Sequence, residues 1–315
     1  MSLLLKEKLL RSNALLVSIA LTIFLGCGDP PTLHSGEDQV DITFWIQRNS
    51  GTNLTLYGVG PAGSQVAAVG ALGTILLSPD GVNWTPRNSG TTYHLFGVAG
   101  SGTTIVAVGY QGTIVTSQDG VTWVPQVSGT TNDLRGIAWT GSQFVAVGDA
   151  GTILTSPDGS SWSISPSGTT NPLHSVSGNG PLLVAVGQGI FTSPSGTLWT
   201  QRGSSASTTI HSVVWSGTQY LAVGDYSGAS VQTSFDGITW SGHPQTTFSN
   251  SLYSAASSGT TFVVVGDVGV SMQSSDGIAW TGIKDLIGPD DLNGVTYFGN
   301  RFITIGVGGK IFSSL

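Results

Sequence analysis

Short apolar runs alternate with polar, glycine-rich turns along most of this chain. The clearest example, residues 134–162, reads LRGIAWTGSQFVAVGDAGTILTSPDGSSW. Its apolar runs are alternating or β-branched, and Gly, Ser and Asp separate them, which predicts short strands joined by tight turns. We expect four strands in this unit: Leu134–Trp139, Gln143–Val147, Thr152–Thr155 and a fourth that begins at Trp162.

The unit recurs seven times. Its second strand returns as VAAVG, IVAVG, FVAVG, LVAVG, YLAVG, FVVVG and FITIG between residues 66 and 306. A tryptophan stands at one place of the repeat, at positions 45, 84, 123, 162, 199, 240 and 280. Four-stranded units of about 40 residues that repeat radially are propeller blades. The pattern therefore predicts an all-β fold, a seven-bladed β-propeller of four-stranded blades.

The two ends of the repeat region predict that the ring is closed. The last copy stops at residues 309–315, GKIFSSL, where the other copies continue into Asp-Gly and tryptophan. The missing strand is found at the other end, because residues 45–52 match residues 84–91 at six of eight positions. We expect this N-terminal strand to complete the last blade, so that the propeller spans residues 42–315 with no long unpaired edge.

The first 26 residues have the pattern of an export signal. Three basic residues precede an apolar run at 14–25, which is shorter than the roughly 20 residues of a spanning helix. The run ends in Phe-Leu-Gly before Cys27, the single cysteine of the chain, and this motif resembles a bacterial lipoprotein signal. The resemblance implies a signal peptide at 1–26, lipidation of Cys27 and a lipidated polar tether at 27–41. The alternative is ordinary secretion with an incidental cysteine. We therefore expect an exported lipoprotein of the cell envelope, in the outer membrane, in the periplasm or at the cell surface.

Composition narrows the classes of partner. Without residues 1–26 the chain holds 7 basic and 16 acidic residues, a formal charge of −9. Such a chain does not neutralise phosphates, so nucleic acid is not expected as a partner. Only 9% of residues are charged, and Ser, Thr, Asn and Gly fill the turns, as in many extracellular binding proteins. We expect a monomer that binds an unknown protein or glycan.

Five blades carry Ser-x-Asp-Gly-x-x-Trp. Glycine accepts a positive φ in a tight hairpin, and an aspartate there can accept hydrogen bonds from nearby backbone N–H groups. Each aspartate lies in a different blade, so we expect a structural role and no metal site or other cofactor. These structural aspartates are Asp80, Asp119, Asp158, Asp236 and Asp276.

With these turns the chain resembles the Asp-box (BNR) propellers, and most closely the seven-bladed photosystem II stability/assembly factor type. The resemblance covers roughly residues 42–315 and implies a non-enzymatic scaffold. The chain has one residue fewer than the Asp box between aspartate and tryptophan. It also lacks the basic residues expected of an assembly factor's binding patch.

Asp-box repeats also occur in sialidases, so a glycan-active hydrolase of that kind is the alternative function. Such enzymes resemble one another in three clustered arginines, a tyrosine activated by a glutamate, and an acidic aspartate. The chain downstream of residue 26 has one glutamate, Glu37, and it lies in the tether. Three arginines share one repeat position in different blades and are not expected to converge: Arg48, Arg87 and Arg202. We predict no catalytic residues.

A candidate ligand site follows from variation within the repeat, because repeat proteins vary the loops of one face. The residue after the first Leu or Ile of each blade changes, and we expect it near the mouth of a central channel. Turns between second and third strands should open on the same face, with irregular lengths in blades four to six. Packing between blades is the alternative for this column, and we prefer it for Tyr57 and Phe96. The predicted ligand-binding residues are Arg135, His174, His211, Asp225, Tyr226, Tyr253 and Asp267.

Overall fold

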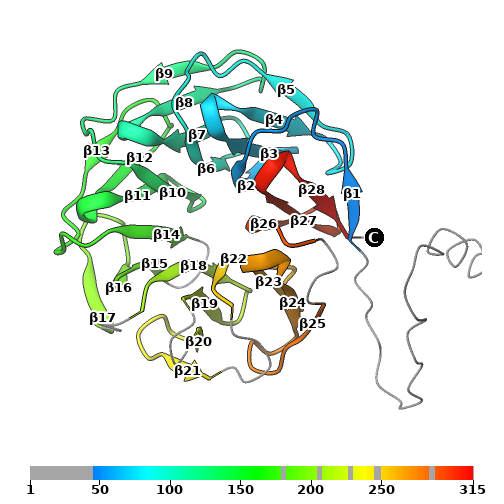
Figure 1. The fold of residues 1–315 in the computed structure, drawn as a ribbon. Coiled ribbons are helices and arrows are strands. Elements are labelled where there is room, and N and C mark those ends of the chain that lie inside the picture. Colours follow the sequence, from blue (N-terminus) through cyan, green and yellow to red (C-terminus); the bar gives the residue numbers. More distant parts are fainter. Residues whose placement is uncertain are drawn as a thin grey trace, which may run out of the picture. The chain divides into compact units, whose positions relative to one another are not determined.

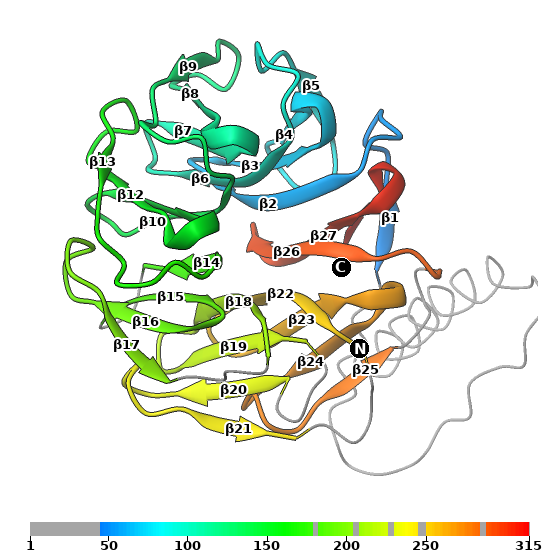
Figure 2. The ribbon, with the colours of Figure 1, turned by 60° about the vertical axis from the view of Figure 1, so that its left-hand side comes forward.

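The computed structural model describes residues 45–178, 182–203, 208–225, 230–244, 250–283 and 288–314. These residues form seven four-stranded antiparallel sheets arranged in a ring, with one strand of each sheet near the centre and one at the rim (Figure 1, Figure 2). The predicted all-β, seven-bladed propeller is confirmed. The signal at 1–26 and the tether with Cys27 lie outside the described residues.

Each blade begins with an inner strand, and this strand starts at the Leu or Ile that recurs in all seven repeats. The inner strands are β2 (Leu56–Ala62), β6 (Leu95–Gly100), β10 (Leu134–Trp139), β14 (Leu173–Ser177), β18 (Ile210–Trp215), β22 (Leu252–Ser257) and β26 (Leu292–Phe298). The second strands are β3 (Gln65–Gly70), β7 (Ile105–Gly109), β11 (Phe144–Gly148), β15 (Leu183–Gly187), β19 (Tyr220–Gly224), β23 (Phe262–Gly266) and β27 (Arg301–Gly306). We number the blades one to seven in this order.

The outer half of each blade holds shorter strands. The third strands are β4 (Ile75–Ser78), β8 (Ile114–Ser117), β12 (Ile153–Ser156), β16 (Gly189–Ser193), β20 (Val231–Ser234), β24 (Ser271–Ser274) and β28 (Ile311–Ser313). The rim strands are β5 (Thr85–Arg87), β9 (Val124–Gln126), β13 (Ser163–Ile164), β17 (Thr200–Gly203), β21 (Ser241–His243), β25 (Thr281–Ile283) and β1 (Ile46–Arg48). In blade three the four predicted strands are found with their starts at most one residue away from the prediction.

The N-terminal strand closes the ring, as the split repeat predicts. Strand β1 is the rim strand of blade seven, where Ile46 pairs with Ser313 and Arg48 pairs with Ile311. Trp45 also donates a 2.9 Å hydrogen bond from Nε1 to Oγ of Ser271 in blade six. Residues more than 220 positions apart in sequence therefore hold the ring together.

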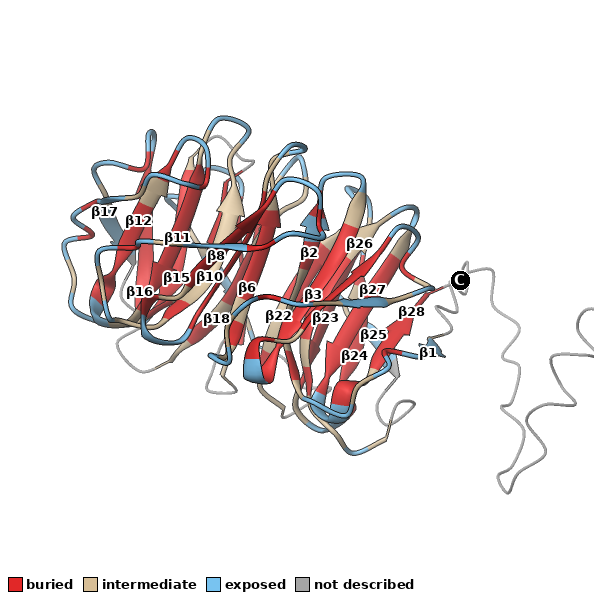
Figure 3. Cartoon of the chain, turned by 90° about the horizontal axis from the view of Figure 1, so that it is seen from above, coloured by how far each residue is buried: buried red, intermediate tan, exposed pale blue. Residues whose placement is uncertain are grey.

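The core lies between neighbouring blades. The second strands are buried at almost every position, because both of their faces are covered by adjacent sheets (Figure 3). Each apolar cluster combines two blades: Val69 and Ile75 of blade one, for example, pack with Leu95 and Ala107 of blade two. Burying this surface is the main favourable contribution to folding.

Small residues let the inner strands approach one another closely. A Cβ atom on Gly58 would lie 2.3 Å from the carbonyl oxygen of Phe96, so a side chain there cannot be accommodated. In blades four to six the same position is serine, and its hydroxyl oxygen accepts a hydrogen bond from a backbone N–H of the next inner strand. The pairs are Ser175 with the N–H of Val213, Ser212 with that of Ala255, and Ser254 with that of Val295, at 3.1–3.3 Å.

The ring has two different faces. One carries the connections between blades and the turns between second and third strands, and we call it the connection face. Five of these turns are short 3₁₀ segments: η1 (Ala71–Gly73), η2 (Tyr110–Gly112), η3 (Asp149–Gly151), η4 (Asp267–Gly269) and η5 (Val307–Gly309). The opposite face carries the Asp-Gly turns, and we call it the aspartate face. Within the described ranges, no helix is long and apolar enough to span a bilayer.

Hydrogen bonds join connections and turns on the connection face. Gln111, in the left-handed conformation with φ of 52°, donates its backbone N–H to Oδ1 of Asp133 at 2.9 Å. Val268 does the same to Asp291 at 3.0 Å. Because these carboxylates precede the inner strand of the next blade, each bond ties two blades together and holds a non-glycine residue in an uncommon conformation.

Candidate functional site

Four neighbouring inner strands place polar side chains side by side on the connection face. Arg135 comes from β10, His174 from β14, His211 from β18 and Tyr253 from β22, each one residue after the start of its strand. The rings of His174 and His211 lie 5.5 Å apart between centroids, and those of His211 and Tyr253 also lie 5.5 Å apart. We call these four residues and the aspartates that bond them the polar row.

Three members of the polar row are held by an aspartate of their own blade. Nε and Nη2 of Arg135 donate to the two carboxylate oxygens of Asp149 at 2.5 and 2.9 Å. Nε2 of His211 lies 2.7 Å from Oδ1 of Asp225. In blade six the hydroxyl of Tyr253 donates to Asp267 at 2.6 Å. All three pairs are 14 residues apart in sequence, because the blade brings the start of its first strand beside its second turn.

His174 lacks such an aspartate because the corresponding turn of blade four is only Gln188, between β15 and β16. Burial lowers the pKa of His174, the nearby His211 and Arg135 lower it further, and the net pKa is about 4. The imidazole is therefore neutral at pH 7, and its ring makes a T-shaped contact with that of His211.

The pKa values of the paired groups reflect the same packing. The hydrogen bond to Asp149 raises the pKa of Arg135 against the effect of burial. For Asp225, burial acts to raise the pKa, but the hydrogen bond and charge of His211 and the hydrogen bonds from Thr209 together outweigh it, so the net pKa is lowered. Burial raises the pKa of Tyr253, and its bond to the Asp267 carboxylate raises it further, so this phenol stays protonated.

In the remaining blades, the residue at the same place on the inner strand is aromatic or carries an amide, and it does not belong to the polar row. The Tyr57 and Phe96 rings pack edge to face with centroids 5.5 Å apart, which is the packing role that the sequence favours for them. In blade seven, Nδ2 of Asn293 donates to the carbonyl of Leu56 at 2.8 Å. The structure thus brings Arg135, His174, His211, Asp225, Tyr253 and Asp267 onto one face. The remaining predicted residue, Tyr226, lies outside the described residues.

The Asp-Gly turns use their aspartates internally. Oδ1 of Asp119 accepts the backbone N–H groups of Val121 and Thr122, both at 2.8 Å, and the Ser117 hydroxyl at 3.0 Å. The bonds from Thr122 and Val121 lower the pKa of Asp119 to about 2. Equivalent pairs of backbone bonds are made by Asp80, Asp158, Asp236 and Asp276.

These five aspartates lie in five blades and do not meet. Across the residues that the structure describes, no group of three or more His, Cys, Asp or Glu side chains could hold a metal ion. Two of the rim arginines are used by their own sheets: Arg48 donates from Nε to Ser313, and Arg202 to Thr192. As the repeat predicts, Arg48, Arg87 and Arg202 lie on the rim strands β1, β5 and β17 of three different sheets.

Sequence reasoning missed the residues that cap the turns of the connection face. Asp133 and Asp291 hold Gln111 and Val268, and His94 accepts the N–H of Leu72 at its Nδ1 atom, 3.1 Å away. All three stand directly before the first strand of a blade. A polar side chain in that column, aligned across the seven repeats, is the signal that could have identified them.

No protein-family model matches the chain, and no curated protein matches it. Among solved structures, YCF48 from Cyanidioschyzon merolae is 18% identical, covers 86% of this chain and 98% of its own, and has a TM-score of 0.67. A structure of YCF48 bound to D1 peptide is also 18% identical, with coverage of 88% and 96% and a TM-score of 0.70. Virginiamycin B lyase from Staphylococcus aureus is 9% identical, with coverage of 86% and 99% and a TM-score of 0.74.

At such low identity, these likenesses establish the fold and nothing finer. The neighbours include both a peptide-bound propeller and an enzyme, so the fold alone does not choose between binding and catalysis. That choice depends on the side chains of the site.

Proposed function

We propose that the protein is an exported, lipid-anchored binding scaffold without enzymatic activity, which engages a protein or glycan through its connection face. The polar row carries this proposal. Its side chains are braced by aspartates and by ring packing, so they are already ordered before a partner arrives. Ordering side chains in advance removes part of the entropic cost of association.

Charge on the connection face favours a partner with basic groups. Six aspartates of the described chain lie there, in the turns or directly before inner strands: Asp133, Asp149, Asp225, Asp267, Asp290 and Asp291. In the same described part the face has two permanent cations, Arg135 and Lys310, and each is already paired with an aspartate. The resulting negative potential attracts cations and accelerates their encounter with the face.

One similar structure, YCF48, holds a D1 peptide, so a ring of this fold can bind a protein segment. The test for this chain is capture of partners from its own envelope extract by the immobilised protein, with a glycan array in parallel. We expect Tyr253→Phe and His211→Gln each to weaken the captured interaction about tenfold, because they remove fixed polar contacts near the centre of the face. Asp119→Asn, on the aspartate face, is the matched control and should bind like wild type.

Anchoring is tested separately. The basic n-region, the short apolar run and Cys27 support lipidation. Metabolic labelling with a fatty-acid analogue should tag the wild-type protein and leave Cys27→Ser unlabelled and soluble. An unlabelled, soluble wild-type protein would exclude the lipid anchor while leaving the binding proposal intact.

A glycan-active hydrolase is the second candidate, and the His211–Asp225 pair favours it, because a histidine held by a carboxylate can transfer protons. A virginiamycin B lyase with a histidine-to-alanine change, solved with Quinupristin, is catalytically inactive. The two candidate functions are distinguished by incubating the protein with sialylated and neutral glycans and measuring the products released. The scaffold releases none, whereas release that disappears in His211→Ala would favour the enzyme.

A further inference from the structure

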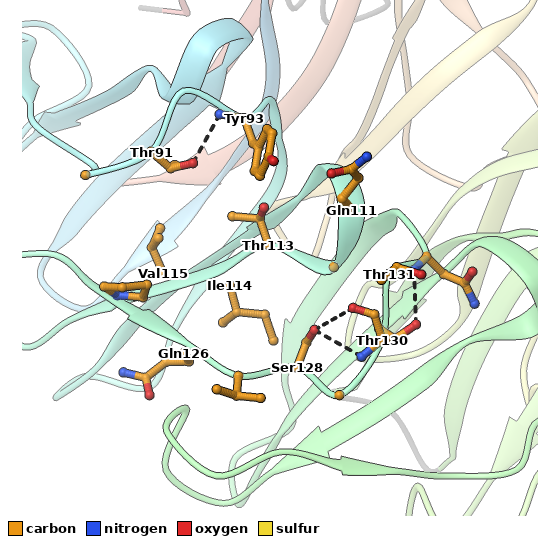
Figure 4. Close-up of a pocket in the computed structure, with 16 residues that line it drawn as sticks. Thr91, Tyr93, Gln111, Thr113, Ile114, Val115, Gln126, Ser128, Thr130 and Thr131 are labelled. Carbon is orange, nitrogen blue, oxygen red and sulfur yellow. Dashed lines mark hydrogen bonds between the residues drawn. The ribbon is translucent and has the colours of Figure 1, made fainter.

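A groove on blade two shares no lining residue with the polar row. The groove, of about 820 Å³, opens between the connection that enters the blade, the η2 turn with the start of β8, and the connection that leaves β9 (Figure 4). Its lining consists of Gly, Ser, Thr, Asn and Gln with Tyr93, Ile114, Val115, Pro125 and Val127. No charged side chain lines it.

An aromatic ring stands at the edge of this groove. Tyr93 is 47% exposed and points toward Thr113 in the groove (Figure 4). Its ring is held edge to face against Tyr110, with centroids 5.8 Å apart, and Tyr110 in turn contacts His94 at 6.4 Å. A ring fixed in this way offers a rigid apolar surface at low entropic cost.

The hydroxyl groups of the groove are fixed by their own backbone. Oγ1 of Thr91 accepts the N–H of Tyr93, and Oγ1 of Thr130 accepts the N–H of Asn132, both at 3.1 Å. A hydroxyl that accepts in this way keeps its hydrogen to donate to a ligand. Gln111, held by Asp133 through its backbone, contributes its amide at the edge of the groove (Figure 4). The groove thus combines an aromatic face with oriented, uncharged hydrogen-bonding groups.

We propose that this groove binds an uncharged carbohydrate, one hexose unit of a glycan chain, with its apolar face stacked on Tyr93. The C–H groups on one face of a pyranose match the negative face of an aromatic ring, while its hydroxyls need both donors and acceptors at its edge. Thr91, Thr130 and Gln111 supply these. An ionic ligand would leave its charge unpaired here, at a cost in desolvation.

A peptide that adds a strand fits this groove less well. Strand addition needs free backbone N–H and C=O groups along an edge. The rim strand β9 has only three residues, and its central residue is Pro125, which has no N–H to donate. The following Ser128 hydroxyl already bonds both the N–H and the C=O of Thr130.

The repeat supplies a matched comparison. An equivalent groove of about 740 Å³ lies on blade three and shares Thr130 and Asn132 with the first. Its Ser167 and Thr169 make the same backbone bonds as Ser128 and Thr130. In this second groove Asn132 replaces Tyr93 and Ala150 replaces Gln111. The same blade architecture thus forms in blade three with neither an aromatic ring nor an amide at these two repeat positions.

The test uses the full chain titrated with cellohexaose, maltohexaose and an N-acetylglucosamine hexamer, followed by calorimetry and NMR. At least one of these is expected to bind, and Tyr93→Asn should reduce its affinity tenfold or more. Gln111→Ala should reduce it severalfold. Both variants carry residues found in blade three, so their melting temperatures should match the wild type.

The groove and the polar row share no residue, so the carbohydrate proposal and the proposed function can be tested and refuted separately. Tyr253→Phe should leave oligosaccharide affinity unchanged, whereas Tyr93→Asn should leave capture of the envelope partner unchanged. Absence of binding by all three oligosaccharides at millimolar concentration overturns the carbohydrate proposal, as does equal affinity in Tyr93→Asn. Binding of uncharged peptides that depends on Tyr93 would instead identify a peptide groove and equally overturn it.

Discussion

At the scale of single residues, the connection face is built from side chains whose partners are fixed in advance. Arg135, His211 and Tyr253 each bond an aspartate of their own blade, whereas no aspartate bonds His174, although the charges of Asp149 and Asp225 lie near it. Protonating His174 would place a charge in a half-buried site next to Arg135, which explains the direction of its pKa. The missing partner makes His174 the acid-sensitive member of the row.

His174 should make the folded protein less stable as the pH falls below neutrality. The pKa of His174 is about 4 in the folded protein, against 6.5 for an unperturbed histidine. Between these values the unfolded chain binds a proton that the native protein does not, so His174 costs stability as the pH falls from 6.5 toward 4. In urea unfolding, lowering the pH from 7 to 4.5 should cost wild type about 2 kcal/mol more than His174→Gln.

An NMR titration of the His174 ring tests the same prediction directly. A midpoint near 4 is expected, while a midpoint near 6.5 would contradict it. The Asp-Gly turns act over a different range, because their lowered carboxylate pKa values give stability that is lost only below about pH 4. Both variants share these turns, so their contribution cancels in the comparison.

At the scale of elements, neighbouring blades are joined by a few side chains that reach across the seam. Tyr220, at the start of β19, is fully buried and reaches the turn before β15 in blade four. Its hydroxyl donates to the carbonyl of Leu182 at 2.5 Å and accepts the N–H of Leu182 at 3.0 Å. One side chain thus satisfies both backbone groups of a residue in the adjacent blade.

Removing that hydroxyl should destabilise the protein without changing the core volume much. Tyr220→Phe loses two hydrogen bonds and leaves the N–H and C=O of Leu182 without these partners. A loss of about 1–3 kcal/mol in unfolding free energy is expected from denaturant titration. Tyr297→Phe is the control, because the Tyr297 ring packs on Phe302 and its hydroxyl makes no hydrogen bond with a described residue. Equal stability of the two variants would contradict the prediction.

At the scale of the whole molecule, seven similar blades form a ring whose connection face is not uniform. Blades one and two carry an aromatic cluster of Tyr57, Tyr93, His94, Phe96 and Tyr110. Blades three to six carry the polar row. The strands are alike in every blade, and both proposed sites lie at positions where the residue differs from blade to blade.

Ring closure gives a prediction at this scale. Removing residues 1–48 deletes strand β1 and Trp45, and so leaves β28 with an unpaired edge and Ser271 without the Trp45 hydrogen bond. In a closed ring every blade packs against two neighbours, so weakening one contact weakens the whole propeller. The loss should therefore lower the melting temperature in one cooperative transition. Calorimetry on the two truncations measures this. Removing residues 1–41 alone is the control and should leave the melting temperature unchanged. A cooperative, unaltered transition without β1 would show that closure does not stabilise the ring.

The sequence by itself determined the fold, because local signals and the repeat agreed. Alternating apolar residues marked the strands, Asp-Gly marked hairpins, and seven copies set the blade number. The match of residues 45–52 to residues 84–91 predicted closure by β1 across the whole length of the chain. The column with Arg135, His174, His211 and Tyr253 was also found, since aligning repeats shows which positions vary.

Only the tertiary structure decided how those side chains combine. The 14-residue pairs of the polar row depend on turn geometry, and the serine bonds between inner strands depend on how closely blades approach. The groove at Tyr93 depends on three segments that are separate in sequence. Such features arise where neighbouring blades meet, and a repeat pattern specifies each blade but not the small rotations and side-chain conformations at the seams. Periodicity therefore gives the framework, whereas contacts between distant residues give the site.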